Sequence, residues 1–536
     1  MSRFGITLER GTSLENKTGN WRNSCPTYVD RIPPCNVACP AGEDIQLWLA
    51  YVQEGDYKAA WEVMIANNPF PAIMGRICYH TCEKACNRGQ YDEPVHINLI
   101  EKFVGDYALE QGFELPSVEN NTGKKIAIVG AGPAGLSAAY FLRRQGHAVT
   151  LFESKPALGG MMRYGVPSYR LSREILDAEV SRMLHLGIEV KVNTEISDLK
   201  ALRKEYDAVF VSTGAHLASK IAMDVQNTEN FFDAVDLLRQ LEMDRTSLPK
   251  LGNSLVVYGG GNTAIDVARS ALRLGIKDVK IVYRRERETM SAHDSEVADA
   301  LSEGVQLVEL RVIKKIDGKQ ILLEKVRIDE QDNSAHMTGE HETIHADTVV
   351  MAIGQVIDKE LMDRSEIKHD QGLVQVDSSM MGSVDGVFFG GDLITYKRNV
   401  TVSIGHGKKA ARYIDAYLKG EQYIPANKHE LASFKRINTA YFDKVKRTTV
   451  EFENNMDFSE LKFDFSANVA ISEAERCFSC GNCFECDNCY GFCPDNAIIK
   501  LGKGKRYMIN KDFCKGCGIC AKECPCGAIK MVSEDK

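Results

Sequence analysis

Cysteine is absent from the whole middle of this 536-residue chain. None of the 390 positions from 87 to 476 is a cysteine, whereas six lie between Cys25 and Cys86 and eleven between Cys477 and Cys526. Free buried thiols would be scattered along the chain, and disulfides are unusual in a cytosolic protein of this size. The two dense groups therefore favour metal ligation at both ends over disulfides or isolated thiols.

Long apolar runs and a strong excess of one charge are also absent. The longest apolar stretch, 126–142, has 17 residues and is interrupted by three glycines and a proline, so it is too short and broken to span a membrane. The first residues lack the apolar core of a signal peptide. The net charge of −8 comes from interspersed residues and gives no basic footprint for nucleic acid. We expect a soluble cytoplasmic protein that binds neither membrane nor nucleic acid.

The hydrophobic and polar patterns divide the chain into four regions. This agrees with its length, because 536 residues are too many for one compact core. Residues 1–123 carry amphipathic helical stretches between their cysteines. Residues 124–420 alternate β-rich apolar runs with helical patterns, which is typical of α/β units with parallel sheets. A polar connector at 421–476 leads to the cysteine-dense residues 477–536.

A glycine-rich turn follows the first apolar strand of the α/β region. Strand 124–129 runs into Gly130-Ala-Gly132-Pro-Ala-Gly135 and an apolar helix. The first glycine of this fingerprint permits a tight turn, the second lets backbone amides approach a pyrophosphate, and the third lets helix and strand pack closely. The next strand ends in Glu153, 21 residues after Gly132, where a carboxylate can accept hydrogen bonds from ribose hydroxyls. The whole unit predicts a dinucleotide site.

A second fingerprint follows strand 254–258, with alanine in its third position, which the pattern allows. Its residues are Gly259, Gly261, Asn262, Thr263 and Ala264. The strand after it ends in Arg284 and Arg285 instead of an acid. Arginine cannot accept a bond from a 2′-hydroxyl but can pair with a 2′-phosphate, so we favour NADPH over NADH. The alternative is that both arginines lie on a solvated loop and that NADH binds.

Two copies of a ferredoxin-type cysteine run occupy the C-terminal region. Each has the form Cys-x2-Cys-x2-Cys-x3-Cys-Pro, and in two-cluster ferredoxins the fourth cysteine of each run ligates the other cluster. One [4Fe–4S] cluster would take Cys483, Cys486, Cys489 and Cys524, and the other Cys514, Cys517, Cys520 and Cys493. Zinc, the competing interpretation, binds four ligands per ion without this doubled run.

Further motifs of the α/β region carry a family resemblance. They are the segments 159–167, 206–215, 259–269, 346–354 and 386–392. With the two glycine-rich turns, they make residues 25–420 similar to the small subunit of glutamate synthase and its relatives. These relatives include the flavin and iron–sulfur half of dihydropyrimidine dehydrogenase and NADPH–ferredoxin oxidoreductases.

The resemblance implies FAD in the first site and the nicotinamide in the second. It also implies that Asp392 contacts the ribityl or phosphate part of FAD, although Asp392 after two glycines is alternatively a turn residue. The helix that begins near Thr401 would point its N-terminus at the flavin ring, where the positive end of the dipole favours the anionic reduced form. The other residues assigned to the cofactors in these motifs are Gly160, Arg163, Thr213, Gly214, Gly354 and Gly391.

The N-terminal cysteines resemble the helical cluster-binding domain of the same family. The resemblance implies one [4Fe–4S] cluster on Cys39, Cys78 and Cys82. Its fourth ligand would be a Gln or Glu about fifteen residues past Cys86, the last of the N-terminal cysteines. Glu101 falls at that place, although a helical glutamate is alternatively a solvated surface residue.

The family phrase Arg-Cys-x-Ser-Cys-Gly-Asn is missing ahead of Cys35, and it occurs instead at 476–482. We hypothesise that Cys477 and Cys480 fold back and join Cys35 and Cys86 around a further cluster. The alternative is that they are idle thiols or a helix cap. Four clusters would use Glu101 and fifteen of the seventeen cysteines and would leave Cys25 and Cys526 as spares.

These cofactors predict an NAD(P)H oxidoreductase. A nicotinamide exchanges a hydride, a cluster passes single electrons, and flavin does both, so flavin must lie between them. Hydride transfer needs no side-chain acid or base, and we name no catalytic residue. Disulfide reduction is excluded because residues 87–476 hold no cysteine for a reactive dithiol.

The sequence does not identify the redox protein with which this chain exchanges electrons. We favour the electron-transfer subunit of a larger complex, for instance with a 2-oxoacid oxidoreductase or another ferredoxin-dependent enzyme. The alternatives are a free-standing NADPH–ferredoxin oxidoreductase, a glutamate synthase small subunit and a non-catalytic redox sensor. The expected partners are other redox subunits or ferredoxin.

The predicted fold is multidomain. It comprises a helical iron–sulfur domain, two Rossmann-like α/β domains and a small α+β ferredoxin-like domain. The expected bounds are 1–123 for the helical iron–sulfur domain, 124–217 with 346–420 for FAD, 218–345 for NAD(P)H, 421–476 for the connector and 477–536 for the ferredoxin-like domain.

Overall fold

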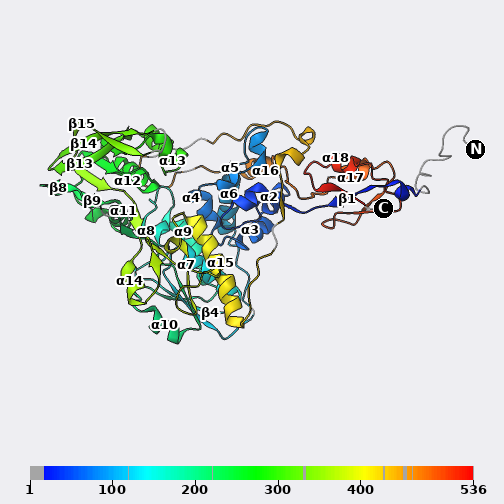
Figure 1. Cartoon of the computed structure of the whole chain (residues 1–536), viewed down its shortest axis with the longest axis horizontal. Helices are drawn as coiled ribbons and strands as arrows, with labels where there is room; N and C mark the ends of the chain where they lie inside the picture. Colours follow the sequence, from blue (N-terminus) through cyan, green and yellow to red (C-terminus); the bar gives the residue numbers. More distant parts are fainter. Residues whose placement is uncertain are drawn as a thin grey trace, which may run out of the picture.

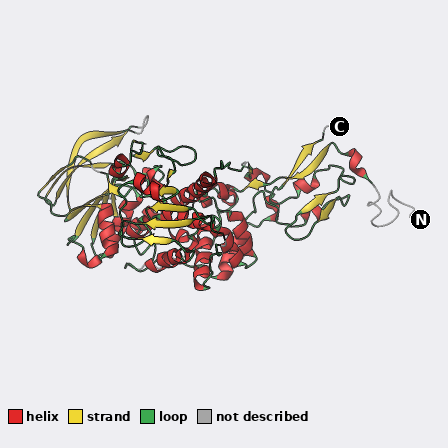
Figure 2. Ribbon diagram, turned by 90° about the horizontal axis from the view of Figure 1, so that it is seen from below, coloured by secondary structure: helices red, strands yellow, loops and turns green. Residues whose placement is uncertain are grey.

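The protein is elongated in its computed structural model (Figure 1). The structure describes residues 17–118, 120–219, 221–329, 334–426, 429–450, 456–461 and 463–534. The two α/β units lie at one end, a helical domain lies in the middle, and a small cysteine-rich module lies at the other end (Figure 1). The strands of the α/β units and of the small module are thus separated by helices (Figure 2).

The helical domain packs around Trp48 and Trp61, whose side chains are fully buried. Asp44 and Asp56 begin its second and third helices by accepting hydrogen bonds from backbone N–H groups of the first turn, as N-cap residues do. The helices are α1 (Pro34–Ala38), α2 (Ile45–Gln53), α3 (Tyr57–Ile65), α4 (Pro71–Ile77), α5 (Thr81–Lys84) and α6 (Ile97–Glu110).

The expected connector is more than a linker. Its helix α16 (Ala467–Glu475) packs on α2 and α6, and Phe465, Ala470 and Ala474 are buried in the same core as Trp48. Residues 467–475 therefore belong structurally to the helical domain, although more than 350 residues separate them from α6 in the sequence.

The first α/β unit is a parallel five-stranded sheet in the order β20-β6-β3-β4-β5. Its strands are β3 (Lys125–Val129), β4 (Ala148–Phe152), β5 (Glu189–Lys191), β6 (Ala208–Val211) and β20 (Val387–Phe389). Helix α7 (Pro133–Arg144) packs along α15 (Val400–Lys419). A β-carbon on Gly407 of α15 would lie 2.3 Å from the carbonyl oxygen of Ala134, so glycine permits this close contact.

The second unit has a parallel sheet in the order β12-β11-β10-β16-β9 and an adjoining sheet in the order β15-β14-β13-β8. The parallel strands are β9 (Phe231–Asp233), β10 (Ser254–Tyr258), β11 (Asp278–Val282), β12 (Gln306–Val308) and β16 (Thr348–Met351). The others are β8 (Asp224–Gln226), β13 (Arg311–Asp317), β14 (Gln320–Ile328) and β15 (Ala335–His345).

The boundary expected at residue 346 is wrong by one strand. β16 pairs with β10 and β9, so it lies in the second sheet and not in the FAD unit. All four residues of β16 are buried, which suits a central strand of either sheet, and the sequence alone does not say which. The chain crosses between the units at the antiparallel pair β7 (Leu217–Ala218) and β17 (Gln355–Val356).

The C-terminal module contains a strand from the other end of the chain. β24 (Ile529–Ser533) pairs antiparallel with β1 (Ser24–Tyr28), and β22 (Ile498–Lys500) pairs with β23 (Tyr507–Ile509). Two short helices, α17 (Asn488–Gly491) and α18 (Ile519–Lys522), complete it. Residues 18–28 therefore lie with this module, although the domain bounds assigned them to the helical domain.

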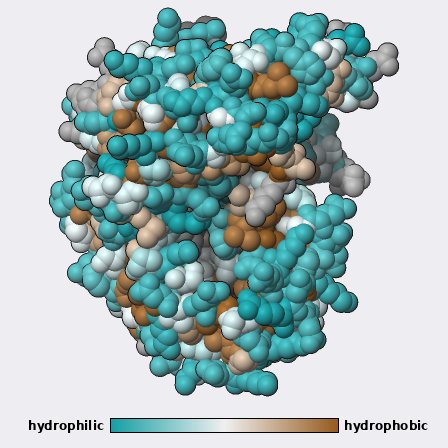
Figure 3. Space-filling model, turned by 90° about the vertical axis from the view of Figure 1, so that its left-hand side faces the viewer, coloured by the Kyte–Doolittle hydropathy of each residue, from teal (hydrophilic) through white to brown (hydrophobic). Residues whose placement is uncertain are grey.

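Within the described ranges, no helix is both long and apolar enough to cross a membrane. The end of the molecule formed by the α/β units is mostly hydrophilic, with hydrophobic residues confined to small patches (Figure 3).

Candidate nucleotide and iron–sulfur sites

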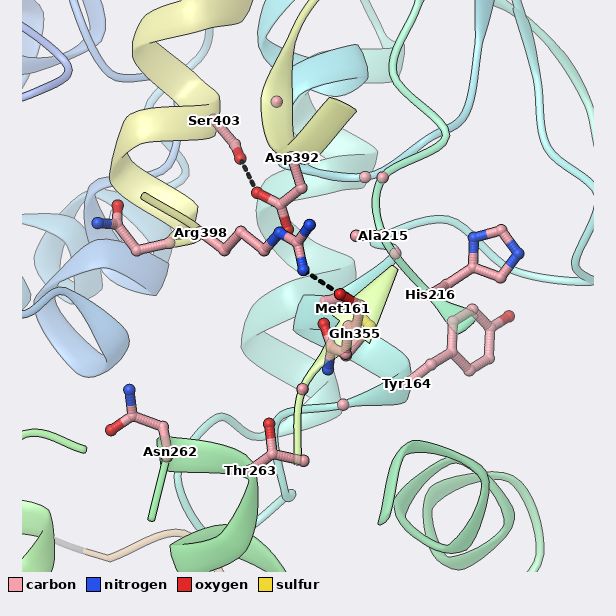
Figure 4. A pocket seen from close by; sticks show the side chains of 18 of the residues that line it. Met161, Tyr164, Ala215, His216, Asn262, Thr263, Gln355, Asp392, Arg398 and Ser403 are labelled. Atoms are coloured by element: carbon pink, nitrogen blue, oxygen red, sulfur yellow. Dashed lines mark hydrogen bonds between the residues drawn. The ribbon is translucent and has the colours of Figure 1, made fainter. Parts of the chain in front are cut away.

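One large cavity, about 1230 Å³, lies between the two α/β units. Both glycine-rich turns border it, as expected for ligands bound at the carboxyl ends of parallel strands. Helix α15, from the first unit, and the turn that contains Asn262 and Thr263, from the second, face each other across it (Figure 4). The volume exceeds that of ordinary single-ligand pockets, which suits two dinucleotides end to end.

Most of the predicted cofactor residues line this cavity. They are Gly130, Gly132, Glu153, Gly160, Thr213, Gly214, Gly259, Gly261, Asn262, Thr263, Arg284, Arg285, Gly354, Gly391 and Asp392. At Gly160, a β-carbon would lie 2.6 Å from the α-carbon of Gly132, so bare backbone forms this part of the wall. Glu153 accepts a hydrogen bond from the Ala131 N–H at 2.9 Å, which fixes its carboxylate beside the first turn.

Four predicted cofactor residues lie outside the lining. Gly135 and Ala264 have packing roles, and a β-carbon on Gly135 would lie 1.9 Å from the carbonyl oxygen of Gly130. Arg163 points away, because it donates to the carbonyl of Leu158 at 2.5 Å and pairs with Asp177. Thr401 faces the helical domain, although its neighbours Val400 and Ser403 reach the cavity.

Several buried polar atoms of the cavity wall make no hydrogen bond with the described residues. Within the described part of the chain, no group accepts from Arg285 Nε or Arg398 Nε or bonds to the Thr213 hydroxyl, and all three atoms are buried. Arg398 does donate another N–H to the Gln355 carbonyl (Figure 4). Buried donors without partners are costly, so they fit a phosphate- and hydroxyl-rich ligand such as FAD or NADP(H).

Asp392 is a buried acidic residue of the cavity wall. Burial raises the pKa of its carboxyl group to about 6, although Arg398 and the Ser403 hydroxyl, 3.5 Å away, act in the opposite direction. The carboxyl group faces the cavity (Figure 4). Its position leaves the carboxyl group accessible to a ligand in the cavity.

Three residues of the site had no signal in the sequence analysis. Tyr79, next to Cys78, lines the cavity and brings the helical domain to its edge. Arg170 and Asp266 also line it and form a buried ion pair at 2.8 Å that joins the two α/β units. Their positions depend on contacts between domains, which local patterns do not encode.

Four residues from the first N-terminal group lie close together. Burial raises the pKa of the Cys82 thiol, and neighbouring Cys78, Cys39 and Glu101 raise it further, which places these side chains around one spot. Glu101 is 6% exposed, so it is not a solvated surface residue. Glu43 is an additional acid there, because the Asn68 amide donates to both Glu43 and Glu101 at 2.9 Å.

A second group brings the two ends of the chain together. Cys35 and Cys86 from the helical domain and Cys477 and Cys480 from the C-terminal region line one small pocket. Burial raises the pKa of Cys35, and the other three thiols add to the rise. These are the four cysteines of the hypothesis, and all lie in one place.

The cysteines of the two ferredoxin-type runs influence one another. Burial raises the pKa values of Cys483, Cys486 and Cys489, and Cys524 from the other run contributes to each rise. Cys493 likewise contributes to the raised pKa of Cys514. Cys514 and Cys517 contribute to the raised pKa of Cys520. Each fourth cysteine therefore lies near the other run.

Within the described residues, no three His, Cys, Asp or Glu side chains are arranged around a single metal ion. A four-iron cluster needs no such arrangement, since each of its irons takes its own cysteine.

Three family models match the chain. One described as pyridine nucleotide-disulphide oxidoreductase matches residues 124–410, and one described as the 4Fe-4S domain II of dihydropyrimidine dehydrogenase matches residues 24–113. A third, described as a 4Fe-4S binding domain, matches residues 507–530.

Individual relatives extend over most of the chain. The NADP(+)-dependent formate dehydrogenase subunit beta of Moorella thermoacetica is 35% identical over 498 residues, which cover 83% of this chain and 70% of that protein. The NADPH-Fe(3+) oxidoreductase subunit beta of Geobacter sulfurreducens is 30% identical, with 84% and 76% covered. The glutamate synthase [NADPH] small chain of Azospirillum brasilense is 32% identical, with 74% and 88% covered.

The family match covers residues 124–410, and both glycine-rich turns in that region border one cavity. The same region has no cysteine, so it binds nucleotides without an internal dithiol. The chain belongs to the pyridine nucleotide-disulphide oxidoreductase family, as an FAD- and iron–sulfur-dependent NAD(P)H oxidoreductase related to the glutamate synthase small chain.

Proposed function

We propose that the protein is the electron-transfer subunit of a larger redox complex, with NADPH as its nucleotide. The observation that carries this proposal is the line of sites along the molecule. The two α/β units that border the cavity lie at one end, the helical domain with two cysteine groups lies in the middle, and the ferredoxin-like module lies at the far end (Figure 1). Such an order suits electron transfer between a nucleotide and a partner protein.

The FAD site would use the first glycine-rich turn, Glu153, Thr213 and Asp392. Flavin bound there supplies the exchange between two-electron hydride transfer and the one-electron steps of clusters. Glu153 would accept hydrogen bonds from ribose hydroxyls, and the close backbone approach of Gly132 and Gly160 supports a pyrophosphate position there. The helical domain reaches the same cavity at Tyr79, adjacent to Cys78.

The NADP(H) site would use the second turn with Arg284 and Arg285. Both arginines line the cavity, and Arg285 Nε has no partner among the described residues. A 2′-phosphate would provide charge-assisted acceptors for them. Two relatives whose names specify NADP(+) or NADPH are consistent with this choice.

Four [4Fe–4S] clusters are proposed, one for each cysteine group. Cys39, Cys78, Cys82 and Glu101 would hold the cluster nearest the flavin, and Cys35, Cys86, Cys477 and Cys480 the next. Cys483, Cys486, Cys489 and Cys524 would hold the third, and Cys514, Cys517, Cys520 and Cys493 the fourth. Within this set, Cys477 and Cys480 join the helical domain to the C-terminal module.

The partner is proposed as a second redox subunit, because the relatives in formate and Fe(3+) systems are named as beta subunits. The test is anaerobic activity of the purified chain. It should reduce a one-electron dye with NADPH, yet form no glutamate from 2-oxoglutarate and glutamine. Dye reduction that fails after reconstitution with FAD and iron would contradict the oxidoreductase role, and glutamate formation would contradict the need for a partner.

A further inference from the structure

Thr401, the second residue of α15, faces a cysteine and not the cavity. Its side chain is buried, and its hydroxyl lies 3.2 Å from Cys78 Sγ and 3.7 Å from Met74 Sδ. A thioether is a weak acceptor, whereas a thiolate is a charged one, so Cys78 is the better partner. Threonine keeps its hydroxyl proton at all ordinary pH values and can act here only as a donor to a thiolate.

The same helical turn reaches the cavity on its other side. Val400 and Ser403 line the cavity, and Ser403 donates to Asp392 at 3.5 Å. Figure 4 shows Ser403 and Asp392 directed toward each other where α15 approaches the cavity. One turn of α15 therefore separates the proposed flavin site from Cys78.

Helix α15 is also held close to the loop of Cys39. A β-carbon on Gly405 would lie 2.1 Å from the carbonyl oxygen of Pro40, the residue after Cys39. Lys408 donates to the carbonyl oxygen of Ala41 at 3.0 Å. The contacts of Gly405 and Lys408 with the Cys39 loop hold α15 in place beside the cysteine group. The hydrogen bond from Thr401 to Cys78 is therefore fixed by the packing of the helix.

We propose that Thr401 raises the reduction potential of the cluster on Cys39, Cys78, Cys82 and Glu101. This inference rests on the ligation proposed above. A reduced cluster carries one more electron, part of which resides on the sulfurs, so a donor to Cys78 stabilises the reduced state more than the oxidised state. Thr401 makes and breaks no bond in the step, in which one electron passes from flavin to cluster. It thereby favours entry of electrons into the cluster chain.

The test is a redox titration of the full-length protein, followed by electron paramagnetic resonance. Thr401→Val keeps the side-chain shape and removes the donor, and it should lower the midpoint potential of one cluster. The expected change is roughly tenfold in the electron-transfer equilibrium, or about 59 mV for one electron. Thr401→Ser keeps the hydroxyl and should retain the potential, which a purely structural role of the methyl group would not predict.

Two variants identify the signal. Cys78→Ser should alter the same cluster that shifts in Thr401→Val. Tyr28→Phe is the matched control, because the Tyr28 hydroxyl lies 3.3 Å from Cys489 Sγ in a different group. It should shift another signal and leave this one in place.

If the valine variant is poorly folded, Thr401→Ala replaces it. A cluster signal that is altered by Cys78→Ser but keeps its potential in Thr401→Val would overturn this inference and leave the proposed function intact. A protein in which Cys78→Ser alters no signal would overturn both the ligation and the inference.

Discussion

The hydroxyl of Tyr28 lies 3.3 Å from the thiol of Cys489, so a side chain near the beginning of the sequence touches a proposed cluster ligand near its end. Tyr28 belongs to β1, which pairs with β24 from Ser24–Ser533 to Tyr28–Ile529. Upstream, Arg22 donates to the carbonyl oxygen of Cys514 at 3.0 Å. Segment 18–28 is thus a structural part of the ferredoxin-like module.

Removal of residues 1–28 should therefore damage the module at the opposite end. We expect the truncated protein to lose up to about eight irons per chain, the content of two [4Fe–4S] clusters, while it keeps the others. Iron analysis after anaerobic reconstitution measures this. Removal of residues 1–16 alone is the control, because it separates the effect of those residues from that of residues 17–28. Full iron content after the longer deletion would mean that β1 is dispensable.

Two truncations test the shared cluster of Cys477 and Cys480. A chain that ends after Asn482 keeps both cysteines and should lose about eight irons, whereas one that ends after Arg476 should lose about twelve. The two truncated chains differ by six residues, and both keep α16. Equal losses would refute a cluster shared between Cys35, Cys86, Cys477 and Cys480.

Replacement of Arg284 and Arg285 by serine should change the nucleotide preference. Each charge-assisted hydrogen bond to a 2′-phosphate contributes about 1.5–3 kcal/mol, so kcat/KM for NADPH should fall roughly 10- to 100-fold for each such bond that is lost, while that for NADH changes little. Steady-state kinetics with both nucleotides measure the effect. Arg287→Ser is the control, because Arg287 lies outside the cavity lining. Equal losses for both nucleotides, or a wild type that prefers NADH, would rule out this role.

Gly405→Ala should loosen the contact between α15 and the helical domain. The added β-carbon would meet the Pro40 carbonyl oxygen at 2.1 Å, and a backbone shift of this kind costs about 1–3 kcal/mol. Calorimetry should show a lower unfolding temperature. Gly491→Ala is the control, because a β-carbon there meets nothing within 4 Å. Equal behaviour of the two variants would mean that the helix accommodates the methyl group.

Local chemistry explains what the sequence predicted well. The glycine-rich turns were predictable because bare backbone is needed wherever strand, helix and ligand approach closely, and Gly132 and Gly160 have that role. The grouping of Cys524 with the first cysteine run and of Cys493 with the second follows from a repeated spacing. Both patterns are recognised from the spacing of residues within one short segment.

Long-range contacts explain what was missed. Nothing in 18–28 indicates a strand partner 500 residues away, and nothing in 348–351 tells which sheet it joins. Arg163 lies in a cofactor motif yet pairs with Asp177 on a neighbouring helix. Thr401 was assigned to the flavin because of its place at a helix start, but its direction depends on Cys78 in another domain.

The pairing of β1 with β24 also constrains how the protein is made. β1 is synthesised before its partner strand, and at about 5–20 residues per second the intervening 500 or so residues take roughly half a minute or more. During that time Tyr28 and Cys35 have no C-terminal partners to meet. The module and the proposed shared cluster can be completed only after residues 477–533 have been synthesised, so iron–sulfur delivery to both sites must come after that point.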